Sequence, residues 1–510
     1  MEAITAMANT ILNTRRPSVV ASVLTSRLLP AQSTAALSVR GHVPCAILRS
    51  RRVERRPELD REAYDPAEMK GSATESRPRA AIANLGCKVN LAEMGAVERM
   101  LLGRGAQLVD LDEPADLVIV NTCAVTAVAD RKSRQMLRRV RRASPNAAVF
   151  VTGCSVAVNS GPFARADPSA RLYGTGSKAA LADDVAAHLD SHTDSAAQVL
   201  QDGGSALGRS DCAFGRTRAF VKVQDGCSFR CTYCLIPTVR GEERSMPADG
   251  VLDEIRLALA EGHREVVLTG INVGSYSDGD VTLPRLVRRI LEETSVERVR
   301  LSSVEPQHVT SELLDVWADS GDRCLPHFHV PLQSGDDTIL RRMGRRYDTA
   351  YYAALIERVR RTSPGAAVHA DLIVGFPGED EAAWSRTAEF LSSLDLAGVH
   401  VFRYSPRPGT PAARMIGRVD ATTQKRRAAE ALTLAADAAA KFACRQLGRD
   451  MRVLFEGRLP DGRWLGHAES HVLVAAPAPD ERPLHNAICV VRAESIDPDA
   501  ADRIAGRVVV

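Results

Sequence analysis

The sequence predicts an α/β protein of three parts: an N-terminal doubly wound parallel sheet, a central partial TIM-like (β/α)6 barrel and a small C-terminal β-barrel. Three observations support this. From Ala80, apolar strands alternate with helical segments, which implies parallel sheets. Six further strands alternate with helices between residues 219 and 404. Beyond Gly448 the pattern changes to short strands with turn signals, which is typical of a small barrel.

These changes of pattern also predict the domain boundaries. A polar stretch rich in Gly and Ser lacks clear periodicity, and we interpret it as a linker. The predicted segments are an N-terminal extension at 1–77, the sheet domain at 78–190, the linker at 191–212, the (β/α)6 barrel at 213–443 and the small β-barrel at 444–510.

The composition is that of a globular protein able to bind metal. Of the 510 residues 45% are hydrophobic, and the net charge of +3 by itself indicates no class of partner. Eleven cysteines are too few and too clustered for a disulfide scaffold, and they suit metal ligation in a reducing compartment. No apolar run approaches the ~20 residues that span a bilayer, so we expect no membrane partner.

The extension at 1–77 differs from the rest of the chain. Up to Val53 it carries several arginines and a single acid, Glu2, a composition that resembles an organelle transit peptide. Alternatively, translation starts downstream, for instance at Met69, or the segment is a disordered tail. We favour these alternatives and expect a cytoplasmic protein. A real transit peptide would place it in an organelle.

Three apolar strands of the predicted sheet each end at a cysteine. They are Ala80–Cys87, Asp116–Cys123 and Ala147–Cys154. Since parallel strands present their carboxyl ends at one edge, these cysteines should meet although 36 and 31 residues separate them. Any one alone would most simply be a buried structural residue, but three equivalent positions favour a three-cysteine cluster. Asn90 is predicted to cap the following helix.

A second group of three cysteines follows the first strand of the predicted barrel. Cys227, Cys231 and Cys234 have C-x3-C-x2-C spacing. Three thiolates from one loop can hold three irons of a 4Fe–4S cluster and leave the fourth iron open. The alternatives are a zinc knuckle or buried cysteines, but no His or Cys follows nearby at zinc spacing. An iron–sulfur cluster is favoured.

Polar or glycine residues stand at the carboxyl ends of the barrel strands, where such barrels bind ligands. Among them, Gly270 and Asn272 are predicted to contact a cofactor, because glycine lets the backbone approach a ligand closely. Ordinary loop chemistry explains either residue equally well.

A basic run follows the second cysteine-bearing strand. Residues 131–142 contain seven basic residues in twelve, and no acid follows Asp130 until well past the run. A solvated helix face is the usual explanation of such a run. Here i,i+4 pairing within the helix cannot neutralise the charge, so we expect a phosphate-rich partner.

With both cysteine groups placed, the chain from about residue 80 to 510 resembles methylthiotransferases of the radical S-adenosylmethionine (SAM) class, and more narrowly the MtaB-type tRNA enzymes. Lys88-Val89 differs from the residues usual in the sister groups that act on isopentenyladenosine or on a ribosomal protein aspartate. The motifs that carry the resemblance are Leu85–Asn90, Asn121–Thr126, Gln224–Cys227, Arg240-Gly241, His329–Gly335 and Ile373–Glu379.

The resemblance implies an activity and its cofactors. Cys227, Cys231 and Cys234 would bind the 4Fe–4S cluster that cleaves SAM, and Cys87, Cys123 and Cys154 a second, auxiliary 4Fe–4S cluster. The substrate would be N6-threonylcarbamoyladenosine at position 37 of tRNA, methylthiolated at adenine C2. An electron donor such as flavodoxin or ferredoxin would be needed, and the sulfur donor is unknown. The C-terminal barrel resembles the TRAM RNA-binding domain.

Two other functions compete with this interpretation. A methylthiotransferase for a ribosomal protein side chain fits less well with Lys88-Val89 and with the basic run. A non-catalytic iron–sulfur electron carrier would have no use for a large barrel or for two incompletely ligated clusters. An RNA-modifying enzyme is therefore the favoured prediction.

Overall fold

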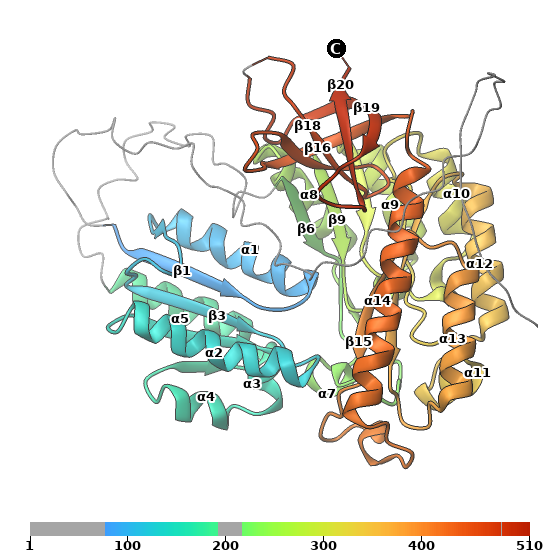
Figure 1. The fold of residues 1–510 in the computed structure, drawn as a ribbon. Coiled ribbons are helices and arrows are strands. Elements are labelled where there is room, and N and C mark those ends of the chain that lie inside the picture. Colours follow the sequence, from blue (N-terminus) through green and yellow to red (C-terminus); the bar gives the residue numbers. More distant parts are fainter. Residues whose placement is uncertain (1–76, 192–216, 481, 510) are drawn as a thin grey trace, which may run out of the picture. The chain divides into compact units, whose positions relative to one another are not determined.

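The computed structural model describes residues 77–191, 217–480 and 482–509, and Figure 1 shows how their helices and strands are arranged. The predicted extension (1–77) and linker (191–212) lie outside the described residues, except for residues 77 and 191. No helix in these three ranges is long and apolar enough to cross a membrane.

The first sheet has five parallel strands in the order β2-β1-β3-β4-β5. The strands expected from apolar runs are β1 (Arg79–Asn84), β3 (Leu117–Thr122) and β4 (Ala148–Gly153). The edge strands β2 (Gln107–Leu108) and β5 (Arg171–Tyr173) are too short to give a pattern in the sequence. The predicted parallel sheet is confirmed.

Helices cover both faces of this sheet, which makes it doubly wound (Figure 1). Val118 and Val120 pack in one apolar cluster with residues of α2, and Ile119 packs in another with α1 and α5. Alternate residues of a strand point to opposite faces, so a continuous apolar run serves both layers. The helices are α1 (Lys88–Gly103), α2 (Ala127–Ala143), α3 (Cys154–Val158), α4 (Gly161–Ala166) and α5 (Lys178–Asp190), with a 3-10 turn, η2 (Thr175–Ser177).

The expectation that Asn90 caps the first helix is wrong. Helix α1 begins at Lys88 with Cys87 at the cap position. Asn90 is buried in the first turn, where its amide donates to the carbonyl oxygens of Leu85 at 3.1 Å and Thr122 at 3.3 Å. Its side chain therefore joins the ends of two strands instead of capping the helix.

The central domain is the predicted partial barrel of six parallel strands. Two three-stranded sheets, in the orders β6-β9-β12 and β13-β14-β15, are connected by bridges from Val299 to Cys324 and from Ser303 to His329. The strands are β6 (Arg218–Lys222), β9 (Glu265–Thr269), β12 (Arg298–Leu301), β13 (His327–His329), β14 (Ala367–Val374) and β15 (Gly398–Arg403).

Amphipathic helices surround this barrel and bury its outer apolar face (Figure 1). The longer helices are α8 (Ala248–Ala260), α9 (Leu283–Glu293), α10 (Ser311–Asp319), α12 (Thr349–Thr362), α13 (Glu381–Ser393) and α14 (Ala421–Cys444). Shorter elements are α7 (Ile236–Val239), α11 (Asp337–Met343), η4 (Val273–Ser275), η5 (Pro306–His308), η6 (Pro411–Arg414), β7 (Gln224–Asp225), β8 (Arg244–Ser245), β10 (Ser277–Asp278) and β11 (Val281–Thr282).

The C-terminal strands close into a barrel in the order β16-β17-β18-β20-β19, as predicted. Closure leaves no free sheet edge. A separate apolar cluster fills it, and Phe442 and Ala443 of α14 belong to this cluster. The strands are β16 (Asp450–Arg458), β17 (Trp464–Ala468), β18 (Leu473–Ala476), β19 (Ile488–Ile496) and β20 (Arg503–Val508).

Two buried arginines attach this small barrel to the amino end of the central barrel. Arg298 and Arg300 of β12 each donate to the Glu265 carboxylate at 2.8 Å, and all three side chains are at most 1% exposed. Arg298 also donates to the carbonyl oxygens of Arg452 at 2.8 Å and His467 at 3.2 Å. The small barrel therefore lies at the opposite strand ends from the cysteines (Figure 1).

The substitution Glu265→Gln should destabilise the protein strongly. Burial alone would raise the pKa of Glu265, but Arg300 and Arg298 hold it far below its usual value, so the carboxylate is charged. Its loss leaves two buried guanidinium groups without a counter-ion, at a cost of about 3–5 kcal/mol. Urea denaturation followed by circular dichroism measures this. The control Glu293→Gln, at an exposed pair with Arg289, should barely move the midpoint. Equal midpoints for the two variants would contradict the prediction.

Candidate active site between two parallel sheets

The first cysteine trio (Cys87, Cys123 and Cys154) lies along the carboxyl edge of the first sheet. Cys87 precedes α1, Cys123 directly follows β3, and Cys154 begins α3. The hydroxyl of Ser155 donates to the carbonyl oxygen of Cys123 at 2.8 Å and ties the ends of β3 and β4 together. Three cysteines from distant parts of the sequence therefore lie at one edge of the sheet.

Gly153 permits the close approach of two of these strand ends. It has a positive φ of 104°, and a Cβ atom there would lie 2.4 Å from the carbonyl oxygen of Thr122. Only glycine fits this conformation and this contact. The glycine before Cys154 is therefore part of how the trio is assembled.

Two cysteines of the trio are shielded from water, since Cys154 is buried and Cys123 is half-buried, whereas Cys87 is exposed. Burial raises the pKa of Cys123, and the nearby Cys87 raises it further. Burial also raises the pKa of Cys154, and the positive charge of Arg240 lowers part of this increase. A metal would have to displace these protons, since the thiolate is the ligand form.

The second cysteine trio (Cys227, Cys231 and Cys234) lies in the loop between β7 and α7. Each sulfur accepts one hydrogen bond: Cys227 from the Phe229 N–H at 3.4 Å, Cys234 from the Ile236 N–H at 3.4 Å, and Cys231 from the Arg345 guanidinium at 3.3 Å. Donors of this kind stabilise thiolates and tune a bound cluster. Burial raises the pKa of Cys227 to about 11 and that of Cys234 to about 12.

Neither trio has the close spacing of a zinc site. Tetrahedral zinc, with Zn–S bonds of ~2.3 Å, holds its sulfurs about 3.8 Å apart. In the part of the chain that the structure describes, only His329, Asp371 and His400 bring three possible ligand atoms within 4.8 Å of one another. Each cysteine trio is therefore more open than zinc requires, which fits the larger core of an iron–sulfur cluster.

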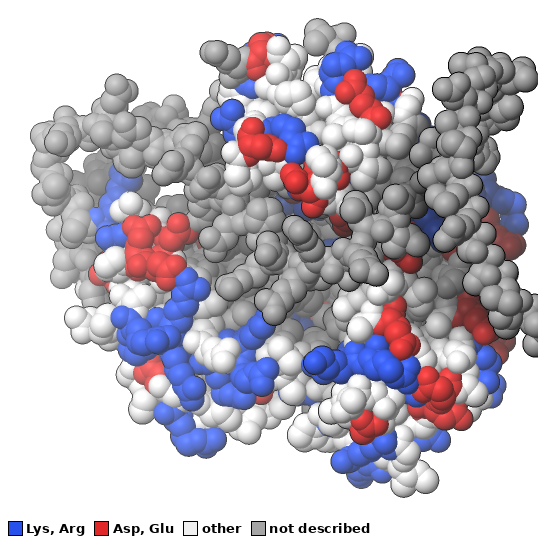
Figure 2. Space-filling view, viewed as in Figure 1, with Lys and Arg blue, Asp and Glu red and all other residues white. Residues whose placement is uncertain are grey.

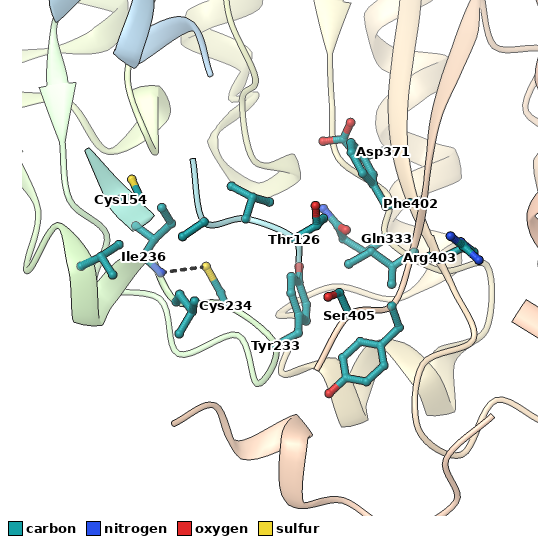
Figure 3. Close-up of a pocket in the computed structure, with 16 residues that line it drawn as sticks. Thr126, Cys154, Tyr233, Cys234, Ile236, Gln333, Asp371, Phe402, Arg403 and Ser405 are labelled. Carbon is teal, nitrogen blue, oxygen red and sulfur yellow. Dashed lines mark hydrogen bonds between the residues drawn. The ribbon is translucent and has the colours of Figure 1, made fainter. Parts of the chain in front are cut away.

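One cavity of about 230 Å³ touches both trios. Cys154 and Cys234 both line it (Figure 3). Most of the remaining wall is apolar, with Val125, Ile236 and Phe402 among its residues, while Gln333 and Asp371 supply polar groups. An apolar cavity with a few fixed polar groups is the usual form of a small-ligand site.

Asp371 lies on the wall of this cavity and contacts two histidines. Its Oδ1 lies 3.0 Å from His329 Nε2 and 3.2 Å from His400 Nδ1, and the hydroxyl of Ser303 is 3.0 Å from His329 Nδ1. Burial would raise the pKa of Asp371, but hydrogen bonds from His329 and His400 outweigh it and hold the pKa well below its usual range. The wall thus presents a charged, oriented carboxylate.

Gln333 has strained backbone geometry where it lines the cavity. Its φ of 71° is rare for a residue other than glycine. Its N–H donates to the Asp371 carbonyl oxygen at 2.7 Å, and its own carbonyl accepts from Ile373 at 2.9 Å. Such strain persists only where neighbours enforce it, and it is common at functional sites.

The two residues predicted to contact a cofactor, Gly270 and Asn272, lie beside the loop of the second trio. The Asn272 N–H donates to the side-chain oxygen of Gln224 at 2.8 Å, and its amide donates to Glu243 at 3.0 Å. Glu243 also accepts from the Ser228 N–H at 3.2 Å. Asn272 is thus linked to the cysteine loop through Glu243, and its contact with a cofactor stays a prediction.

Arg240 joins the two trios through buried polar contacts. Its guanidinium, with the side chain 1% exposed, donates to Asp225 at 2.9 Å, to Glu93 at 3.1 Å and to Asn90 at 2.7 Å. Asp225 precedes the second trio, and Asn90 lies within 3.9 Å of the Cys87 sulfur. The sequence placed Arg240 in a motif but did not predict this role, since its partner Glu93 is 147 residues away.

Comparisons with known proteins agree with this geometry. Residues 221–391 match the model of the radical SAM superfamily, and residues 79–173 match that of the uncharacterized protein family UPF0004. The radical SAM methyltransferase TsrM from Kitasatospora setae, solved with cobalamin and a [4Fe-4S] cluster, has a similar fold. The TM-score is 0.50 at 16% identity, over 66% of this chain and 77% of TsrM.

Curated relatives extend over most of the chain. The threonylcarbamoyladenosine tRNA methylthiotransferase MtaB of Bacillus subtilis is 31% identical over 76% of this chain and 88% of its own length. The MtaB of Thermotoga maritima is 33% identical over 77% and 89%. A tRNA-2-methylthio-N(6)-dimethylallyladenosine synthase of Maricaulis maris is 34% identical over 75% and 87%.

The central barrel and its superfamily match define a radical SAM enzyme. The chain belongs to the radical SAM methylthiotransferase family, and the resemblance to its MtaB-type members is confirmed. Its cofactors therefore include an iron–sulfur cluster and SAM.

The substitution Gly226→Ala should impair iron loading of the enzyme. Gly226 has a φ of 72°, and an added Cβ would lie 1.9 Å from the carbonyl oxygen of Glu242, so the loop carrying Cys227 must move. We expect less iron per chain after anaerobic reconstitution, measured by colorimetric iron assay. Gly250→Ala in α8, where a Cβ meets open space, is the control and should load normally. Normal loading of the Gly226 variant would show that the loop adapts.

Proposed function

We propose that this enzyme methylthiolates adenine C2 of N6-threonylcarbamoyladenosine at position 37 of tRNA, using two 4Fe–4S clusters and SAM. The observation that carries the proposal is a cavity lined by one cysteine from each trio. The names of the MtaB relatives support the substrate. The second trio would hold the cluster that binds SAM, and the first trio the auxiliary cluster.

When bound, these groups supply the radical chemistry and the sulfur that an unreactive aromatic C–H requires. The protein supplies position and shielding. Apolar residues on most of the cavity wall exclude water, while the Gln333 amide and the Asp371 carboxylate offer hydrogen-bond partners to a base edge. Enzymes that modify a base take it out of its stack, and Phe402 and Tyr404 on the cavity wall offer aromatic faces to receive it.

The substrate is tested by mass spectrometry of tRNA nucleosides from cells that lack the gene. Loss of 2-methylthio-threonylcarbamoyladenosine, with accumulation of its unthiolated precursor, is the expected result, and a plasmid copy of the gene should restore the product. Loss of the isopentenyl-type methylthio nucleoside instead would assign the other tRNA substrate. Unchanged tRNA would contradict the RNA substrate and leave the ribosomal protein aspartate as the candidate.

Helix α2 offers a surface for the tRNA backbone. It starts at Ala127, next to the cavity-lining Thr126, so its exposed face leads away from the cavity. Figure 2 shows basic side chains gathered on the face of the molecule that carries α2. The expectation that acids leave this run unneutralised is only partly right: Arg134 pairs with Asp130, and more distant acids pair with two further arginines, Arg139 with Asp112 and Arg141 with Asp167.

Four basic side chains of α2 remain for phosphate groups. Arg131, Lys132, Arg138 and Arg142 are exposed, and no ion pair is found for them within the described ranges. Their combined replacement by Ala should weaken tRNA binding. It should also reduce the slope of the logarithm of the binding constant against the logarithm of the salt concentration by up to about 3. Filter binding at several salt concentrations measures both. Arg285 and Arg288 of α9, replaced together, are the control. Equal slopes for the two variants would remove α2 from the interface.

We place the reaction in the cytoplasm, with flavodoxin or ferredoxin as the class of electron donor. Reducing conditions keep the six cysteines of the two trios available for metal ligation. If residues 1–77 act as a transit peptide, the same chemistry would take place in an organelle.

A further inference from the structure

The first trio is surrounded by more positive than negative charge. Two buried carboxylates, Glu93 and Asp225, face three cations. Glu93 contacts Lys178, Lys222 and Arg240, and Asp225 contacts Lys222 and Arg240. Burial lowers the pKa of Lys178 to about 7, so only part of one positive charge is left over in this group at neutral pH.

Arg407 adds a second, wholly unpaired positive charge. It is 7% exposed, its Nε has no hydrogen-bond partner, and no ion pair or donated hydrogen bond joins it to another residue in the described parts of the chain. A buried guanidinium is rarely left without an anion, because burial without a partner is strongly unfavourable.

The segment that carries Arg407 packs against the loop of the first trio. The Ser405 hydroxyl accepts a hydrogen bond from the Ala127 N–H at 3.1 Å, and residues from both segments line the same cavity. Arg407 follows Ser405 by two residues and Ala127 follows Cys123 by four, so the chain at Arg407 lies near the loop that carries Cys123.

We propose that Arg407 is the counter-ion of an anionic iron–sulfur cluster held by Cys87, Cys123 and Cys154, and that it thereby sets the retention and reduction potential of that cluster. The inference rests on the proposed second cluster. Three thiolates around a 4Fe–4S core of charge 2+ give a net charge of −1, which becomes −2 on one-electron reduction. A nearby cation favours the more negative state, so its removal should make reduction harder.

Arg407 is a sharper test than Arg240. Arg240 already has Asp225 and Glu93 as partners, so its removal would disturb the junction between the two trios. Arg403 provides a control, since it has the same charge in the same segment and also lines the cavity, but its side chain is exposed to water, which screens its charge. The experiment therefore compares Arg407→Gln, Arg407→Lys and Arg403→Gln.

The variants are made in a chain whose second trio is replaced by Ala, so that only the first trio can hold a cluster. After anaerobic reconstitution we measure the iron content, the redox titration by electron paramagnetic resonance, tRNA binding, and thermal unfolding with and without the cluster. Arg407→Gln should shift the reduction equilibrium about tenfold toward the oxidised form, about 59 mV for a one-electron couple. Arg407→Lys should recover part of this shift, and Arg403→Gln should match the parent.

Thermal unfolding separates a charge partner from a structural residue. Without the cluster, Arg407→Gln should be at least as stable as the parent, because an unpaired buried charge is removed. Binding of the cluster should raise the unfolding temperature of Arg407→Gln by less than it raises that of the parent. A variant that is equally destabilised in both forms would make Arg407 a structural residue and overturn the inference.

The remaining outcomes also decide the question. If the parent chain holds no iron, the second cluster itself is absent and the inference falls with it. If the parent loads a cluster but Arg407→Gln and Arg403→Gln have the same potential, Arg407 is not the counter-ion while the second cluster stands. If Arg407→Gln instead weakens binding of tRNA at an unchanged potential, its anion is a substrate group, which also overturns the inference.

Discussion

The buried guanidinium of Arg240 determines how the two cysteine trios face each other. It follows the second trio in the sequence, yet two of its three acceptors, Asn90 and Glu93, belong to the first helix of the other domain. Removing any one acceptor would leave buried charge or a buried donor unsatisfied. The cavity between the trios therefore depends on a contact that contains neither cysteine nor cofactor, which explains why so polar a group lies between two apolar cores.

In both sheets the candidate site lies at the carboxyl ends of the strands, whereas the C-terminal barrel is attached at the amino ends of the central barrel. Parallel strands present their loops for ligands at the carboxyl ends. The two carboxyl edges meet at the cavity, whereas Glu265, Arg298 and Arg300 at the amino ends hold the C-terminal barrel. Attachment at that end leaves the cysteine loops clear.

Much of this fold can be predicted from local patterns, but the partners across domains cannot. Apolar runs ending in cysteine locate β1, β3 and β4 because the strand and its loop are adjacent in sequence. The same reasoning misplaces Asn90 and overstates the free charge on α2, because Asp112 and Asp167 reach that helix only through the folded sheet. The role of Arg240 cannot be predicted for the same reason, because periodicity indicates which face of a helix or strand is buried but not which charged residues pair across domains.

The wall of the cavity combines properties that normally oppose each other. An apolar surface disfavours charge, yet Asp371 stays ionised there because two histidines donate to it. Its backbone carbonyl also fixes Gln333 in a strained conformation beside it. A polar pair held this rigidly can orient a base without bringing in water, and water would compete for any reactive species formed nearby. The strain and the buried charge are thus best understood as conditions for positioning a substrate between the two cysteine-bearing loops.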